Sequence, residues 1–389
     1  MKLPLPDESE SDEVSDRDAP KERRALVALS LVKGVGPSRL RALLARFGTP
    51  SRVLHASRRA LQTVDGIGTA TAASIAEFDD HAAVDEQLER ADTLDATLIA
   101  PWDAQFPDRL KQIYDPPALL WMRGTLTDGD ARALSIVGTR RCTDYGRAQA
   151  HHFAGELVRH GFTVVSGLAY GVDAAAHKGA LDAGGRTLAV LGSGLGRIYP
   201  QKNAGLAARA SKSGAVLSEF GLDAAPDAPH FPERNRIVSG LTLGTLVVES
   251  HAKGGSLITA RMAVEQNREV FAVPGTVGRS ASVGTNHLIQ RGHAKLVLDV
   301  DDILEELHVP AMPEPADDAP GDPSPPAASE PDLSGREKTL YDALSDTPVH
   351  VDRLCSDTGL SSSTALATLL TLEMKGLVRQ LAGKQFRRA

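Results

Sequence analysis

Two adjacent arginines follow a short apolar run in the stretch SIVGTRRCTDYG. The run at 134–137 is typical of a buried strand, and Gly138 lets the chain turn sharply after it. Arg140 and Arg141 then lie where a strand of an α/β sheet ends at its ligand crevice. Two guanidinium groups in that place predict an anionic ligand, which is a nucleotide, a sugar phosphate or the backbone of a nucleic acid.

The segment VVSGLAYGVDAAAHKGAL has the same strand-loop-helix form. Ser166 and Gly167 end its strand, and the loop amides after them form a candidate anion nest. Asp173 and His177 lie four residues apart on the following helix, so their side chains can meet. They can act as an acid/base pair or as a structural hydrogen bond that fixes the loop. The structural interpretation is favoured, because no nucleophile stands beside them.

The segment VVESHAKGGSLITARMAVE predicts the strongest anion site in the chain. Lys253, Gly254, Gly255 and Ser256 precede a helix, and Thr259 lies on its first turn. Backbone N–H groups, the helix dipole and the lysine converge there on one point. The segment is not a Walker A motif, because no lysine follows the glycines at the required place.

The segment HFPERNRIVSGL combines Phe231 with Arg234, Asn235 and Arg236. Positive charge for a phosphate backbone and a ring on which a base can stack are the components of single-strand recognition. The alternative is a surface loop held by salt bridges. That alternative is weaker here because five cations are expected near one sheet edge, namely Arg140, Arg141, Arg234, Arg236 and Lys253.

Motifs of known catalytic, metal or cofactor sites are missing from the sequence. The stretch LGSGLG lacks the spacing of G-x-G-x-x-G, and Tyr199-Pro200 interrupts the helix that should open there. Zinc-ligand spacing, H-E-x-x-H, G-x-S-x-G and paired carboxylates are also absent. We therefore expect no cofactor, no metal, no catalytic residue and no enzymatic activity.

Six short apolar runs supply the strands that position these segments. Helical patterns separate the runs, which predicts an α/β fold with a Rossmann-like, doubly wound and mostly parallel sheet over residues 99–308. The runs are LSIVG, FTVVSG, TLAVLG, AVLSEF, TLVVES and VFAVPG.

The flanks of the sheet region differ from it in composition. Residues 1–22 are charged and poor in apolar residues, which predicts a disordered acidic tail, and 309–334 is a proline-rich linker pattern. Residues 23–98 contain two glycine hairpins before helices, LVKGVGPSRLRALL and VDGIGTATAASI, as in a helix-hairpin-helix or SAM-like domain. A plain helical cap with glycine turns is the alternative. Residues 335–389 predict a winged-helix domain.

The composition predicts the cellular compartment in which the protein acts. The chain has 389 residues, a net charge of −7 and two cysteines, too few for a disulfide framework, so we expect the reducing cytoplasm. No apolar run approaches the ~20 residues of a membrane span. The negative net charge argues mildly against nucleic acid, although net charge does not report local patches.

Taken in order, the motifs resemble the bacterial DNA-processing protein A (DprA, or Smf) family over residues 100–307. The resemblance implies binding of single-stranded DNA, dimerisation, and loading of the recombinase RecA in natural transformation, with single-strand-binding protein as a further partner and no nucleotide cofactor. It makes Arg140 the arginine of the family's G-[ST]-R motif and places Lys202 and Asn203 in its Y-P-x-x-N loop. The family's S-G-S-L turn is Gly254–Leu257 here, so one hydroxyl is lost.

Two other functions are compatible with parts of the sequence. A nucleotide-processing enzyme of the lysine-decarboxylase-like group would carry P-G-G-x-G-T, whereas this chain has KGGSLITA. A duplex-DNA regulator would read bases with its winged helix, but the third helix there, SSSTALATLLTLEMKG, has no arginine to reach a base edge.

Overall fold

The computed structural model describes residues 19–308, 335–344, 349–375, 377–381 and 385–388. The chain divides into two compact units, 1–315 and 316–389, and each is described by itself. The segments expected to be an acidic tail and a linker, 1–18 and 309–334, lie outside the described residues.

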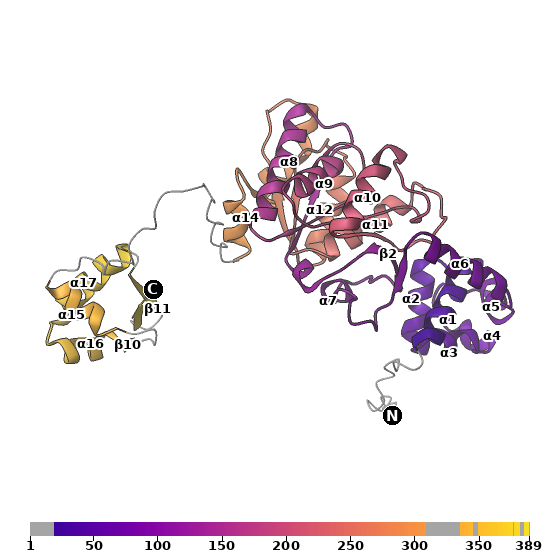
Figure 1. The fold of residues 1–389 in the computed structure, drawn as a ribbon, viewed down its shortest axis with the longest axis horizontal. Helices are drawn as coiled ribbons and strands as arrows, with labels where there is room; N and C mark the ends of the chain where they lie inside the picture. The colour runs from indigo at the N-terminus through magenta and orange to yellow at the C-terminus, as the bar shows by residue number, and fades with distance from the viewer. Residues whose placement is uncertain (1–18, 309–334, 345–348, 376, 382–384, 389) are drawn as a thin grey trace, which may run out of the picture. The chain divides into compact units, whose positions relative to one another are not determined.

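Six helices open the first unit and lie together at one end of the sheet, beside β2 (Figure 1). Both predicted glycine hairpins are present: Gly34 and Gly66 have φ of 87° and 77°, and Gly36 and Gly68 are the N-caps of the helices that follow. The helices are α1 (Ala19–Leu31), α2 (Pro37–Phe47), α3 (Pro50–Leu54), α4 (Arg58–Leu61), α5 (Thr69–Ala76) and α6 (His81–Thr93).

Helix α1 begins at Ala19, four residues before the predicted start of the helical domain at 23. Glu22 lies inside this helix and is buried, and its carboxylate accepts hydrogen bonds from the backbone N–H (2.9 Å) and the hydroxyl of Ser51. Ser51 lies in the first turn of α3, where a carboxylate is favoured by the unpaired N–H groups. A charged residue near a helix start was therefore mistaken for part of a disordered segment.

The sheet follows the order β1-β2-β6-β5-β4-β3-β7-β8-β9 in the described part of the chain. From β6 to β9 the neighbours are parallel, and β1 and β2 pair antiparallel at one end. All six predicted strands are present. The bounds are β1 (Thr97–Ile99), β2 (Leu120–Gly124), β3 (Ala133–Val137), β4 (Thr163–Ser166), β5 (Thr187–Val190), β6 (Ala215–Ser218), β7 (Gly244–Val247), β8 (Glu269–Ala272) and β9 (Lys295–Leu296).

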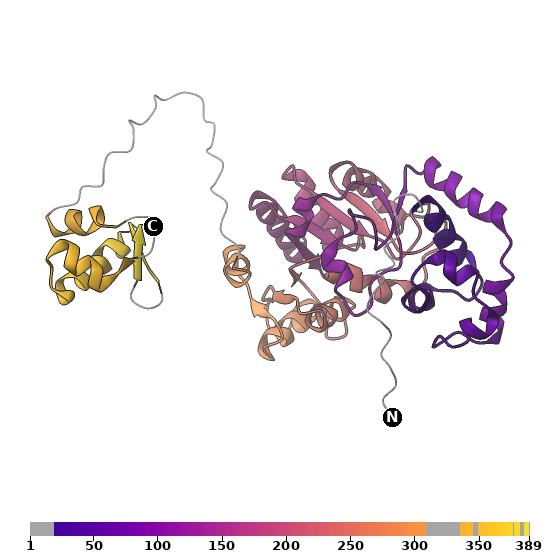
Figure 2. The same cartoon turned by 90° about the horizontal axis from the view of Figure 1, so that it is seen from below.

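Helices cover both faces of the sheet (Figures 1 and 2), as predicted. Val164 of β4 packs into a core with α8 and α9, and its neighbour Val165 packs into the opposite core with α11 and α12. The elements are α7 (Asp108–Lys111), α8 (Asp144–Arg159), α9 (Val172–Asp182), α10 (Ala204–Ser213), α11 (His230–Gly240), α12 (Ser256–Glu265), α13 (Val283–Gln290), α14 (Asp301–Glu306) and the 3-10 turns Asp128–Ala131, Gln201–Asn203 and Ser280–Ser282.

The N-terminal helices share one core with the sheet. Leu26 and Leu43 of that region belong to the same buried cluster as Trp121 of β2, Val216 of β6 and Leu206 of α10. Burial of each such side chain contributes about 1.5–3 kcal/mol, so α1–α6 are held firmly against the sheet.

The second unit has the predicted elements of a winged helix. Its sheet contains one strand more than the predicted two-stranded wing. Its sheet order is β10-β12-β11, and Leu340, Leu354, Leu369 and Phe386 form part of its core. Ser361 caps its third helix as predicted, accepting from the Thr364 N–H at 3.3 Å. The elements are α15 (Arg336–Asp342), β10 (Val349–His350), α16 (Val351–Thr358), α17 (Ser362–Met374), β11 (Val378–Leu381) and β12 (Gln385–Arg388).

Candidate nucleic-acid interface

A cavity of about 750 Å³ lies at the carboxyl ends of the parallel strands, where the chain order reverses between β3 and β7. Ligand crevices of open α/β sheets form at such switch points. Eleven of the predicted site residues line it: Gly138, Arg140, Arg141, Gly167, Phe231, Arg234, Asn235, Gly254, Gly255, Ser256 and Thr259. The apolar runs therefore bring segments more than 100 residues apart in the sequence to one edge of the sheet.

Arg140 and Phe231 form the centre of this cavity. Arg140 is exposed, and the Cζ of its guanidinium lies over the Phe231 ring, 4.9 Å from the ring centroid. The ring of Tyr199 lies 5.7 Å from that of Phe231, and with Tyr170 it lines a small adjoining pocket. A cation and two aromatic rings are thus presented together at the cavity wall.

Arg234 adds a buried positive charge to the lining of the same cavity. Its Nη1 donates to the Val190 carbonyl, and only 4% of the residue is exposed. Burial lowers the pKa of Arg234 to about 10, Asp173 raises it in part, and Arg140 lowers it further. The group still carries its charge at neutral pH, and its burial shields this charge from water, which strengthens its attraction for an anion.

The N-terminus of α12 forms the opposite side of the cavity. Gly255 is its N-cap, no side chain caps it, and Gly254, Gly255 and Ser256 face the cavity. The Ser256 hydroxyl donates to Ser250 Oγ at 2.9 Å. A side chain at 254 would collide with that same Ser250 hydroxyl unless the hydroxyl turned away.

Close approach, rather than a turn, requires the glycines at 138 and 167. Gly138 was expected to give a sharp turn, but it is not among the residues with positive φ; a Cβ there would lie 2.9 Å from the Glu249 carbonyl and 2.5 Å from Val172 Cγ2. At Gly167 a Cβ would collide with the guanidinium of Arg234. Both glycines therefore admit neighbouring groups to the cavity wall.

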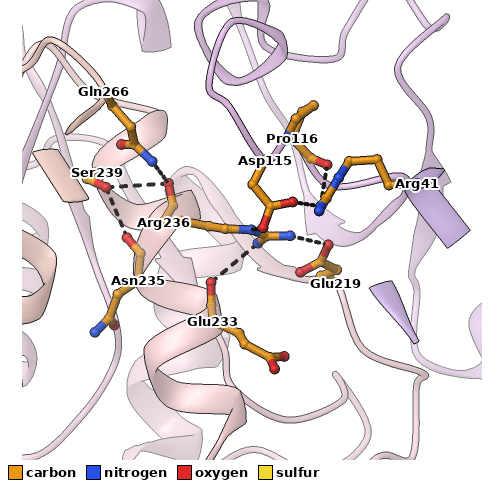
Figure 3. A network of polar contacts seen from close by, with 9 residues as sticks. All are labelled: Arg41, Asp115, Pro116, Glu219, Glu233, Asn235, Arg236, Ser239 and Gln266. Atoms are coloured by element: carbon orange, nitrogen blue, oxygen red, sulfur yellow. Dashed lines mark hydrogen bonds and ion pairs between the residues drawn. The ribbon is translucent and has the colours of Figure 1, made fainter. Parts of the chain in front are cut away.

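Three predicted contacts are corrected by the structure. The Ser166 hydroxyl is buried and donates to the Ile136 carbonyl at 2.6 Å, and the buried Asn203 amide donates to the carbonyls of Leu168 (2.8 Å) and Ala169 (3.2 Å). Arg236 is buried in ion pairs with Asp115 and Glu219 (Figure 3). These side chains support the loops and helix of the cavity and do not face it.

In the predicted anion nest after β4, a loop amide already donates to a carboxylate of the protein itself. Asp173 accepts from the Ala169 N–H at 3.3 Å, so this loop is held by its own helix. Burial raises the pKa of the Asp173 carboxyl, while Arg234 and the amides of Ala169 and Gly167 lower it in part. The carboxylate fixes the loop, as the structural interpretation expects, but it does so through the Ala169 N–H and not through His177, whose Nδ1 pairs with Thr187.

His177 is likewise structural. Its Nδ1 lies 2.7 Å from the Thr187 hydroxyl, which itself donates to the Val164 carbonyl. Burial, with a smaller contribution from Arg234, lowers the pKa of His177 to about 3. The imidazole is therefore neutral and fully buried, and it cannot exchange protons with a ligand in the cavity.

Lys202 and Lys253 are exposed and lie outside the cavity lining, so their contacts with a ligand stay predictions. Sequence reasoning missed His251 and Ala169, which line the cavity, and Tyr170 in the adjoining pocket. His251 lies two residues before Lys253, in a loop whose sequence already predicted an anion site. This proximity could have identified His251 as a further lining residue. Within the described residues, no group of acidic, histidine and cysteine side chains could hold a metal, and no helix could cross a membrane.

Models of known families match the sheet region, the C-terminal region and the N-terminal helices of the chain. A family model described as DNA recombination-mediator protein A matches residues 97–308, one described as DprA winged helix domain matches 324–384, and a SAM-like helix-hairpin-helix tandem matches 27–78.

Relatives cover most of the chain. Protein Smf of Synechocystis is 34% identical over 393 residues, which is 93% of this chain and 98% of that protein. DNA processing protein DprA of Bacillus subtilis is 46% identical over 204 residues, 52% of this chain and 68% of that protein. The X-ray structure of DNA processing protein A from Streptococcus pneumoniae matches with a TM-score of 0.64 and 32% identity, covering 72% of this chain and 95% of that one.

Proposed function

The chain belongs to the DNA recombination-mediator protein A family, and from that premise we propose that it binds single-stranded DNA in the cavity at the carboxyl edge of its sheet. One observation carries the proposal: the exposed guanidinium of Arg140 lies over the Phe231 ring, in a cavity that the buried, charged Arg234 also lines. Cations that bind a phosphate backbone beside a ring that stacks a base are the components of single-strand binding.

A single strand suits this site better than a duplex or a free nucleotide. A base must leave its stack to reach Phe231, which costs a few kcal/mol in a duplex and much less in a single strand. The exposed Arg141 and the N-terminus of α12 lie along the same cavity, so successive phosphates of a polymer can be bound together.

We also propose that the site is not catalytic. His177 is neutral and fully buried, and Asp173 lines the cavity but accepts a hydrogen bond from the Ala169 N–H. Neither group is placed to activate water or a nucleophile.

Because the chain belongs to this family, we extend the proposal to a role in recombination. A protein that loads RecA must hold the strand and still expose a surface to the recombinase. No residue of α8 or α10 lines the cavity, so a strand bound there would leave these two helices free for a partner. We propose that the chain acts in the cytoplasm as a homodimer that assembles RecA on strands coated with single-strand-binding protein.

Direct titration tests the binding proposal. Fluorescence anisotropy would compare an oligo-dT strand with a duplex of the same length at several salt concentrations. We expect tighter binding of the single strand and an affinity that falls with salt by a log-log slope of about −0.7 per phosphate contacted. Equal affinity for both forms would contradict the proposal.

A further inference from the structure

We infer that Arg41, on a helix outside the cavity, is a positioning residue for DNA binding, acting through Asp115 and Arg236 on helix α11. The inference rests on the proposed function. It starts from a chain of four charged groups of alternating sign, Arg41, Asp115, Arg236 and Glu219, which joins the N-terminal helices to the sheet (Figure 3).

Asp115 is the centre of this chain of charges. One of its carboxylate oxygens pairs with Arg41 of α2, and the other lies 3.1 Å from Nε of Arg236 in α11. Arg41 also donates to the Pro116 carbonyl at 3.4 Å. Arg236 completes the chain through its Nη2, which lies 2.6 Å from the Glu219 carboxylate just after β6. The segments of Asp115 and Glu219 therefore meet on the guanidinium of Arg236, and Asp115 links it to Arg41.

Burial makes these ion pairs depend on one another. The side chains of Arg236 and Glu219 are 8% and 2% exposed, so neither charge can turn to water if a partner is lost. Burial lowers the pKa of Arg41, and so does the nearby Arg236, while Glu219 raises it. The two guanidiniums repel each other, and Asp115 between them relieves that repulsion.

Helix α11 connects these ion pairs to the cavity, because it carries Arg236 and also residues of the cavity lining. Residues two apart on a helix point in nearly opposite directions, so Arg236 holds one side of α11 and Arg234 extends from the other. Phe231, Arg234 and Asn235 of the same helix line the cavity. A rotation of α11 released by loss of Asp115 would move the Phe231 ring away from Arg140.

The alternative is that Arg41 contacts DNA itself. Its guanidinium is already occupied by Asp115 and Pro116, and only 25% of its side chain is exposed. The two roles predict opposite effects of Asp115→Asn. Removing this negative charge and freeing two arginines should tighten binding if those arginines contact DNA. It should weaken binding if they position α11.

The test measures oligo-dT affinity of the full chain by anisotropy, with thermal unfolding in parallel. Asp115→Asn is expected to weaken binding by about 2- to 30-fold, as changes within a coupled network do. Asp108→Asn is the matched control, because Asp108 lies in α7, a few residues before Asp115, is exposed, and pairs with Lys111 on the surface. It makes the same change of charge and should leave the affinity for oligo-dT unchanged or slightly higher than that of the wild type.

Arg41→Gln serves as a second variant in case Asp115→Asn unfolds, because it leaves the buried Arg236–Glu219 pair intact. We expect weaker binding, partial rescue by Arg41→Lys, and an unchanged salt slope, whereas a lost phosphate contact lowers the slope by about 0.7. Tighter binding by Asp115→Asn, or wild-type affinity of Arg41→Gln, would overturn the inference. A wild-type chain that does not bind the strand would overturn the proposed function as well.

Discussion

The guanidinium of Arg140 lies 4.9 Å from the centroid of the Phe231 ring, although 91 residues separate them in the chain. Arg140 follows β3 and Phe231 lies in the first turn of α11. The pair joins a group that binds phosphate to a ring that stacks a base, and it is the geometric basis of the proposed binding mode.

Phe231→Leu should weaken oligo-dT binding by about tenfold, because stacking of a base on an aromatic ring contributes about 1–3 kcal/mol. The salt slope should not change, since no charge is removed. Anisotropy titrations across salt would check both quantities. Phe162→Leu is the control: Arg132 lies 4.7 Å from its ring at the opposite edge of the sheet, so this variant loses a similar contact away from the cavity and should keep its DNA affinity.

Gly167→Ala should lower the free energy of unfolding by about 1–3 kcal/mol, the usual cost of overpacking a core. The new methyl group would collide with the buried guanidinium of Arg234. Thermal or denaturant unfolding would measure the change. Gly205→Ala is the control, because a Cβ there meets open space on helix α10, and it should be neutral or slightly stabilising. Equal stability of the two variants would show that the guanidinium moves aside freely.

Replacing His177 with Gln should flatten the pH dependence of stability between pH 6.5 and about 3. The pKa of His177 falls from 6.5 to about 3 in the folded protein, so the unfolded chain binds a proton in this window and the folded chain does not. Wild-type stability therefore falls as pH decreases, by up to about 1.4 kcal/mol per pH unit from this group. Denaturant melts at several pH values would measure both slopes; parallel slopes would contradict the assignment.

Much of the architecture could be predicted because apolar runs and glycine hairpins are local signals. The six parallel strands, both hairpins and the glycine turn before α12 follow from such signals. The antiparallel strands β1 and β2 were not among the six predicted runs, and their place in the sheet depends on the core that they share with α1–α6.

The errors at the site have one physical origin. Arg234 and Arg236 look alike in the sequence, but only the three-dimensional arrangement shows that Asp115 and Glu219 lie on one side of α11 and the cavity on the other. Likewise, Ser166 donates to a neighbouring strand that is 30 residues away in the chain. The partners of buried polar groups are set by packing, and a linear pattern does not record them.

The salt dependence of oligo-dT binding by Arg140→Ala tests the central claim most directly. Arg261→Ala on α12, an exposed arginine paired with Glu265, is the matched control and should bind as the wild type does. We predict that Arg140→Ala binds at least about tenfold more weakly, with a log-log salt slope smaller by about 0.7 and an unchanged melting temperature. Wild-type affinity and slope in a folded Arg140→Ala variant would show that the strand does not bind at this cavity.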